Sequence, residues 1–141
     1  MNLWFLDASV FLACEDPGDT NHADALRLLE GSDPLATLDL AFYEVTNVAV
    51  RSWQDISAAH RLREHVSAVG ADGGLVSVEL SLLASAATIA EEYGISVYDA
   101  AYVAAAQAAE SQLVSCDVRD LVSRGLACLP ADATSGREGT R

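Results

Sequence analysis

Short apolar segments alternate with longer segments of helical periodicity along most of this chain. This alternation is typical of α/β domains, because neighbouring parallel strands are joined by helical crossovers. Five segments are short, apolar and bounded by turn-forming or acidic residues, as buried strands are. These predicted strands cover residues 3–6, 35–38, 75–78, 113–115 and 127–129. We therefore expect an α/β fold with a mainly parallel sheet of about five strands.

The segments between these strands show the residue patterns of helix starts and ends. Asn21 and Asp39 stand where they can cap helices, and Gly31 and Gly94 stand where helices end. Helices are predicted over residues 9–14, 22–30, 39–53, 57–69, 81–93, 98–110 and 118–124. No periodicity continues after these elements, so we expect one domain over residues 1–130 and a disordered C-terminal tail over residues 131–141.

The length and hydropathy of the chain fit a single domain with its own core. The chain has 141 residues, of which 51% are hydrophobic, and compact domains commonly contain about 100–150 residues. No apolar run approaches the roughly 18 residues of a membrane span, and no secretory signal is evident. Three cysteines without metal-ligand spacing suit a reducing compartment. We expect a cytoplasmic protein with no membrane contact.

The chain is strongly acidic. It contains 21 acidic and 8 basic residues, every base being an arginine, and its formal net charge is −13. Such a protein repels nucleic acid, so composition alone disfavours a nucleic-acid partner. Two features could reverse this inference. They are divalent cations that neutralise some of the acids, and grouped arginines such as Arg51, Arg61 and Arg63.

Three aspartates stand just after predicted strands or at a helix start. Asp7 and Asp117 follow predicted strands, and Asp99 begins a predicted helix. In open parallel sheets the carboxyl ends of the strands form the ligand crevice, which places Asp7 and Asp117 at a candidate site. Asp7 lies in the apolar stretch LWFLDASVFL, where an unpaired carboxylate costs on the order of several kcal/mol. The alternative for all three is helix capping, for which aspartate is favoured.

Glu44 is a fourth candidate, because helix capping cannot explain it. It lies a turn into the predicted helix over residues 39–53, within the mostly apolar stretch AFYEVTNVAV, and an exposed helix face is its alternative. Four carboxylates that share a site repel one another, and the chain has no lysine to neutralise them. Oxygen ligands favour Mg²⁺ or Mn²⁺. Such a site suits phosphodiester hydrolysis, because a divalent cation lowers the pKa of a bound water and neutralises charge on phosphoryl oxygens.

The chain resembles the PIN-domain endoribonucleases, and among them the compact VapC-type toxins of bacterial type II toxin–antitoxin pairs. The resemblance runs from residue 3 to about residue 129 and rests on the segments LDASV, YEVTNV, YDAAYVAAA and LVSCD. It implies a three-layer α/β/α PIN domain over residues 1–130. It also implies that Asp7, Asp99 and Asp117 bind metal, directly or through water. Glu44 is then a further ligand or the group that orients the attacking water.

The resemblance extends to the surroundings of the acids and to partners. Ser9 and Ser115 match small hydroxyl residues that can orient the metal ligands. Asp120 falls where many relatives have an extra acid, with a solvated helix position as its alternative. The implied activity is Mg²⁺-dependent cleavage within RNA, with Mn²⁺ as the alternative cofactor. The implied partners are RNA, a cognate antitoxin and a second copy of the chain.

The absence of lysine departs from many RNA-cleaving relatives and leaves the RNA-binding surface open. Arg51, Arg61 and Arg63 are the candidate guides for the RNA backbone, with a solvated helix face as the favoured account of each one alone. A PIN-like domain that is catalytically inactive and only binds a partner is an alternative function. A receiver-type signalling domain also gathers aspartates around Mg²⁺, but it usually relies on a lysine. A haloacid-type phosphatase has a second aspartate where Ser9 stands.

Overall fold

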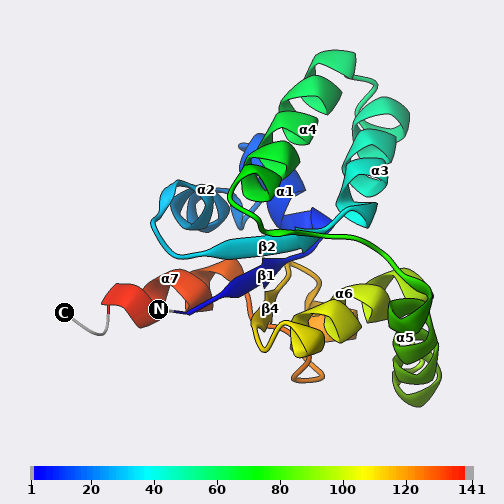
Figure 1. Cartoon of the computed structure of the whole chain (residues 1–141). Coiled ribbons are helices and arrows are strands. Elements are labelled where there is room, and N and C mark those ends of the chain that lie inside the picture. The colour runs from blue at the N-terminus through cyan, green and yellow to red at the C-terminus, as the bar shows by residue number, and fades with distance from the viewer. Residues whose placement is uncertain (1, 139–141) are drawn as a thin grey trace.

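Four parallel strands form the central sheet of the computed structural model, which describes residues 2–138 (Figure 1). The strands are β1 (Trp4–Leu6), β2 (Leu35–Leu38), β3 (Leu75–Val76) and β4 (Gln112–Val114), in the order β3-β2-β1-β4. Leu6 pairs with Thr37 of β2 and with Val114 of β4, so the central strand ends level with both neighbours. The residues that follow β1 and β4 therefore emerge at the same edge of the sheet.

Helices cover both faces of this sheet and complete the three layers that the resemblance implied (Figure 1). One face carries α1 (Ala8–Glu15), α2 (His22–Glu30), α3 (Leu40–Asn47) and α4 (Ile56–Ala71), and the other carries α5 (Leu80–Tyr93) and α6 (Val97–Ala108). Two short π-helical segments, η1 (Val48–Ser52) and η2 (Val118–Val122), and the helix α7 (Pro130–Glu138) complete the described chain. None of the helices within residues 2–138 has both the length and the apolar character that a membrane crossing requires.

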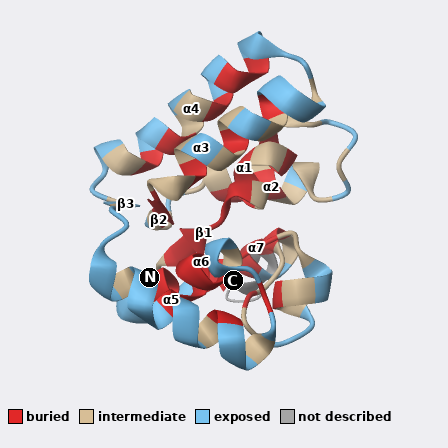
Figure 2. Ribbon diagram, turned by 90° about the vertical axis from the view of Figure 1, so that its right-hand side faces the viewer, coloured by how far each residue is buried: buried red, intermediate tan, exposed pale blue. Residues whose placement is uncertain are grey.

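The core lies around β1 and α6, where the buried residues in Figure 2 gather. Trp4, Phe5 and Leu6 are buried because β1 is an inner strand with a helical layer on each face. Residues 100–106 of α6 are also buried, and five of them are alanines. Their small side chains allow α6 to approach both the sheet and α5 closely. This packing holds the first turn of α6 in a fixed position at the edge of the sheet.

The fifth predicted strand is too short to count as a strand, although its residues pair with β4. Val114 and Cys128 form a single parallel bridge. The Ser115 amide donates to the Cys128 carbonyl, and the Cys128 amide donates to the Leu113 carbonyl, both at 2.9 Å. Pro130 follows two residues later and begins α7, so the ladder does not extend.

The single helix predicted over residues 39–53 is wrong in two respects. The α-helix ends at Asn47 and continues as the π-helical segment η1, and the Asp39 side chain does not cap its start. The Asp39 Oδ1 atom instead accepts a hydrogen bond from the Val78 amide at 3.2 Å. The Asn21 side chain, also expected to be a cap, makes no capping hydrogen bond to α2. Local propensity predicted that the Asp39 side chain would cap the helix, but this side chain accepts instead from the segment that follows β3.

The expectation of a disordered tail over residues 131–141 is wrong for its first part. Residues 130–138 form α7, which begins at Pro130, a favoured first residue of helices, and packs against α2. Ala133 and Thr134 are buried there, and the Thr134 hydroxyl donates to the Pro130 carbonyl at 3.2 Å. Such small buried side chains leave little periodic apolar signal in the sequence. Residues 139–141 of the expected tail lie outside the described residues.

Candidate metal centre

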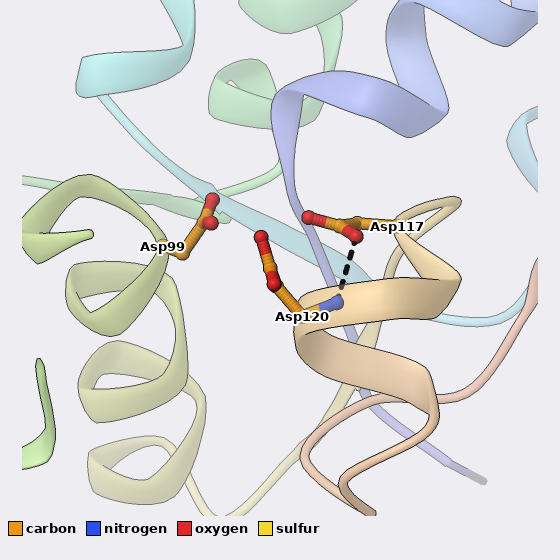
Figure 3. Close-up of side chains that lie close together, drawn as sticks. All are labelled: Asp99, Asp117 and Asp120. Carbon is orange, nitrogen blue, oxygen red and sulfur yellow. Dashed lines mark hydrogen bonds between the residues drawn. The ribbon is translucent and has the colours of Figure 1, made fainter. Parts of the chain in front are cut away.

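Three carboxylates converge where the ends of β1 and β4 meet the first turn of α6. Oxygen atoms of Asp99, Asp117 and Asp120 all lie within 4.8 Å of one another. Figure 3 shows Asp99 pointing from α6 toward Asp117 and Asp120, which come from the start of η2. The Arg119 Nε atom lies 3.7 Å from Asp120, but that arginine side chain is 93% exposed and screened by solvent. Asp120 thus lies beside two of the predicted ligands, on a partly exposed position of η2.

Local hydrogen bonds explain how the chain holds these acids. The Ser96 hydroxyl caps α6 by accepting from the Asp99 amide at 3.0 Å, so Asp99 lies in the first helical turn. Asp117 caps η2 by accepting from the Asp120 amide at 3.0 Å. The capping interpretation is therefore correct for Asp117 and wrong for Asp99, whose helix is capped by Ser96. Capping occupies one carboxylate oxygen of Asp117 and leaves its second oxygen available to a cation.

Asp7 is buried directly after β1, with 5% of its surface exposed. It also acts as a helix cap, because its Oδ1 atom accepts from the Ser9 amide at 3.0 Å and from the Ser9 hydroxyl. Burial raises the pKa of Asp7 from 3.8 to about 6, hydrogen bonds from Ser115 and Ser9 oppose this rise, and the charges of Asp99 and Glu44 add to it. Asp7 therefore shares the electrostatic field of the other predicted ligands.

Ser9 and Ser115 connect the ends of the two strands that carry the acids. The Ser9 hydroxyl oxygen accepts from the Cys116 amide at 2.8 Å and lies 3.4 Å from the Ser115 hydroxyl oxygen. The Ser115 hydroxyl in turn accepts from the Asp117 amide at 3.0 Å and is fully buried. These contacts fix the backbone on both sides of the site. They place both serines where they can orient Asp7 and Asp117.

Glu44 approaches from α3, on the opposite side of the sheet from α6. It is half-buried, and its Oε1 atom accepts a hydrogen bond from the Tyr102 hydroxyl at 2.7 Å. Burial raises the pKa of Glu44, the hydrogen bond from Tyr102 lowers it, and the charge of Asp99 raises it. Burial, followed by the nearby Glu44 carboxylate, raises the pKa of the Tyr102 hydroxyl far above its ordinary value. No sequence pattern singled out Tyr102, although its spacing of three residues from Asp99 places both residues on one helix face.

The three arginines expected to guide RNA have no described contact with the acids of this cluster. The Arg61 guanidinium binds Glu15 of α1. Arg63 donates to the His60 ring at 2.7 Å, and Arg51 is exposed on η1. Among the described contacts, none of these three arginines therefore neutralises an acid of the site.

The donor set fits a hard divalent cation. Burial, followed by the charge of Asp117, raises the pKa of Asp99, and the pKa values of Asp7 and Glu44 are raised as well. Burial and the charges of neighbouring acids both disfavour the ionised forms of these carboxylates, and a bound cation would offset that cost. All of the converging atoms are oxygens, which suits Mg²⁺ or Mn²⁺ better than softer metals.

Comparisons with known proteins agree with the observed fold. The family described as PIN domain matches residues 4–123. A toxin–antitoxin complex from Klebsiella pneumoniae contains a chain of 19% identity and TM-score 0.65, covering 92% of this chain and 98% of that one. VapC20 of Mycobacterium tuberculosis, a sarcin–ricin loop cleaving toxin, has 21% identity and TM-score 0.64, with coverage of 82% and 91%. FitAcB from Neisseria gonorrhoeae has 16% identity and TM-score 0.65, with coverage of 90% and 97%. No curated protein matches the chain.

Proposed function

Since the chain belongs to the PIN domain family, we propose that it is a metal-dependent endoribonuclease and the toxin of a VapC-type toxin–antitoxin pair. Family membership supports a nuclease and removes the receiver-type alternative. The observation that carries the proposal is the convergence of Asp99, Asp117 and Asp120 within 4.8 Å, next to a buried Asp7. Acids gathered in this way, with one solvent-exposed arginine at their margin, are costly to the fold, which is understandable if they serve a bound cation.

Asp7, Asp99 and Asp117 would hold the cation, Mg²⁺ or Mn²⁺, with Asp120 beside them. When bound, such a cation lowers the pKa of a water and neutralises charge on phosphoryl oxygens. Ser9 and Ser115 keep Asp7 and Asp117 in place through the hydrogen bonds that connect the ends of β1 and β4. Because these contacts are made by the chain itself, the site is largely formed before substrate arrives.

The chain's own residues favour attack by water over attack by the ribose 2′-hydroxyl. The second route leaves a cyclic phosphate and is usually served by histidines that move protons. All three histidines are placed elsewhere: His22 contacts the Ala13 carbonyl, His60 contacts Arg63, and His65 contacts Glu15. Glu44 is the group that accepts a hydrogen bond from the attacking water and orients it. The expected products carry a 5′-phosphate and a 3′-hydroxyl.

The proposed substrate is single-stranded or looped RNA. A site on the rim of a sheet does not reach a phosphate inside a regular duplex easily, whereas splayed loops can enter it. VapC20, which shares the fold, cleaves the sarcin–ricin loop, and this supports a looped substrate here. Arg51, Arg61 and Arg63 remain candidate guides for the RNA backbone, although Arg61 would have to leave Glu15 to act as one.

The proposed partners are a cognate antitoxin and a second copy of the chain, in the cytoplasm. Solved relatives include a toxin–antitoxin complex, which supports an antitoxin. A guanidinium is the natural complement of the acid cluster because it binds carboxylates bidentately and stays charged. We expect an antitoxin arginine or lysine near Asp7 and Asp99. Growth arrest on expression alone, relieved by a gene for a small neighbouring protein, tests this.

The activity is tested by incubating purified protein with total RNA in Mg²⁺ or Mn²⁺ and mapping the fragment ends. We expect internal cuts with 5′-phosphate ends that are lost in EDTA and with Asp99→Asn. Cyclic-phosphate ends, or cleavage that EDTA leaves intact, would contradict the mechanism. A wild-type protein that binds its partner but cuts no RNA would instead support the inactive, binding-only alternative.

A further inference from the structure

Tyr102 is a buried tyrosine of α6 whose hydroxyl reaches Glu44 on the other side of the sheet. We infer that Tyr102 is a positioning residue, whose hydroxyl holds the Glu44 carboxylate in the orientation that the reaction needs. This inference rests on the proposed nuclease function and gives a specific role to a residue outside the acidic set. It concerns the direct contact between the two side chains.

The contact joins two layers of the fold at the edge of the sheet. Glu44 lies on α3, which packs against α1 and α4, whereas α6 packs against α5 and against β1, β2 and β4 (Figure 1). The Tyr102 hydroxyl donates to Glu44 Oε1 at 2.7 Å, an ordinary distance for a well-formed O–H···O hydrogen bond. Tyr102 is 2% exposed, so its ring has little freedom to move. The hydroxyl therefore offers Glu44 a fixed anchor in the opposite layer.

The position of Tyr102 on α6 ties this anchor to the acid cluster. Asp99 and Tyr102 are three residues apart and share one face of the helix. Asp99 joins Asp117 and Asp120, and Tyr102, one turn later, holds Glu44. A single rigid helix thus sets the position of Glu44 relative to the three clustered carboxylates.

Glu44 needs such an anchor because its neighbours repel it. The negative charge of Asp99 acts on Glu44, and Glu44 and Asp99 both act on Asp7. A half-buried glutamate in this field gains by rotating toward solvent, where its charge is screened. A hydrogen bond to an ionised carboxylate is stronger than one between neutral groups, so the Tyr102 hydroxyl can resist that rotation.

A double-mutant cycle of Tyr102→Phe and Glu44→Ala tests the inference. The phenylalanine ring keeps the packing of α6 and removes only the hydroxyl. Tyr93→Phe is the matched control, since Tyr93 is a partly buried tyrosine of α5 outside the site. RNA cleavage is measured as kcat and KM in Mn²⁺, and the unfolding equilibrium is measured in urea with EDTA.

Tyr102→Phe is expected to lower kcat about tenfold with an unchanged KM for RNA, as removal of a group that orients a ligand does. In the Glu44→Ala background it is expected to cause no further loss of kcat. In EDTA the two substitutions are expected to be non-additive in the unfolding equilibrium, with a coupling of about tenfold. Full activity of Tyr102→Phe, or an equal loss in both backgrounds, would overturn the inference while leaving the nuclease proposal standing.

The same measurements also test the inference if the proposed nuclease function fails. If the wild-type chain cuts no RNA, the proposed function fails, and the unfolding cycle in EDTA decides the inference alone. Non-additive unfolding then supports the anchoring of Glu44, and additive unfolding overturns it.

Should Tyr102→Phe fail to fold, Glu44→Asp replaces it, because the shorter side chain withdraws the carboxylate from Tyr102 and keeps its charge. The inference then requires a loss of kcat of about tenfold, and wild-type activity overturns it.

Discussion

Two groups of acidic side chains, one of them Glu15 alone, differ in how far basic partners neutralise their charge. Glu15, at the end of α1, is bound by the Arg61 guanidinium and lies 3.4 Å from the His65 ring, both from α4. Asp99, Asp117 and Asp120 gather within 4.8 Å with one exposed arginine at their margin. Within the described residues, the first group is neutralised by the fold, and the second is left with excess negative charge. The contrast supports the proposal that the excess negative charge serves a bound cation.

The largest expected effect that separates the two groups is on RNA cleavage. Asp99→Asn removes the charge of one proposed ligand and is expected to lower kcat at least about 100-fold, as loss of a group that stabilises transition-state charge does. Glu15→Gln, the matched control, is expected to leave cleavage within about twofold, because it lies outside the proposed site. Both are measured on the same RNA in Mg²⁺. Equal losses from the two variants would remove the distinction between the groups.

A second effect concerns stability without metal. Because burial raises the pKa of Asp7 from 3.8 to about 6, the folded chain holds this proton more tightly than the unfolded chain does. This group therefore lowers the stability of the wild type as pH rises from about 4 to about 6, by about 3 kcal/mol in all. Asp7→Asn cannot ionise and escapes that loss.

In EDTA at pH 7, Asp7→Asn is therefore expected to unfold at a higher urea concentration than the wild type, and the difference is expected to vanish near pH 4. Urea unfolding of both proteins at the two pH values measures it. An Asp7→Asn chain that is less stable than the wild type at pH 7 would mean that the carboxylate is needed as a structural cap.

A third, smaller effect is expected at the serines that connect β1 and β4. Ser9→Ala removes the hydroxyl that bonds to Asp7 and accepts from the Cys116 amide. Cleavage is expected to fall about tenfold, with Mn²⁺ affinity falling by a similar factor. Ser67→Ala, at an exposed position on α4, serves as the control. Unchanged Mn²⁺ affinity and cleavage in Ser9→Ala would show that the strand ends keep their places without this hydroxyl.

The smallest expected effect is at the neutralised group. Glu15→Gln breaks an ion pair whose arginine side chain is 53% exposed, and pairs screened by solvent in this way contribute little to stability. We expect a slight loss of stability in urea, opposite in sign to the gain from Asp7→Asn. A gain from Glu15→Gln in EDTA would show that repulsion dominates at both groups.

Local sequence signals were sufficient for the elements that depend on neighbours in the chain. The bounds of α2 and β2 agree with prediction, because the apolar pattern and the glycine or proline at their ends act over a few residues. Asp7 and Asp117 could be placed beside the sheet edge because each follows an apolar strand. Signals failed where a distant partner decided the outcome. The Asp39 carboxylate accepts from the Val78 amide instead of capping its helix, and the small side chains of α7 are buried against α2.

Patterns along the chain were enough to predict the α/β class, the order of the strands along the chain and four candidate acids. Three further contacts follow from the packing of the elements: Asp120 lies beside Asp99 and Asp117, Arg61 binds Glu15, and the Tyr102 hydroxyl donates to Glu44. Each of these depends on contacts between elements that are separate in the sequence. Hydropathy and capping preferences act within a few residues, whereas charge compensation depends on which helices the packed sheet brings together.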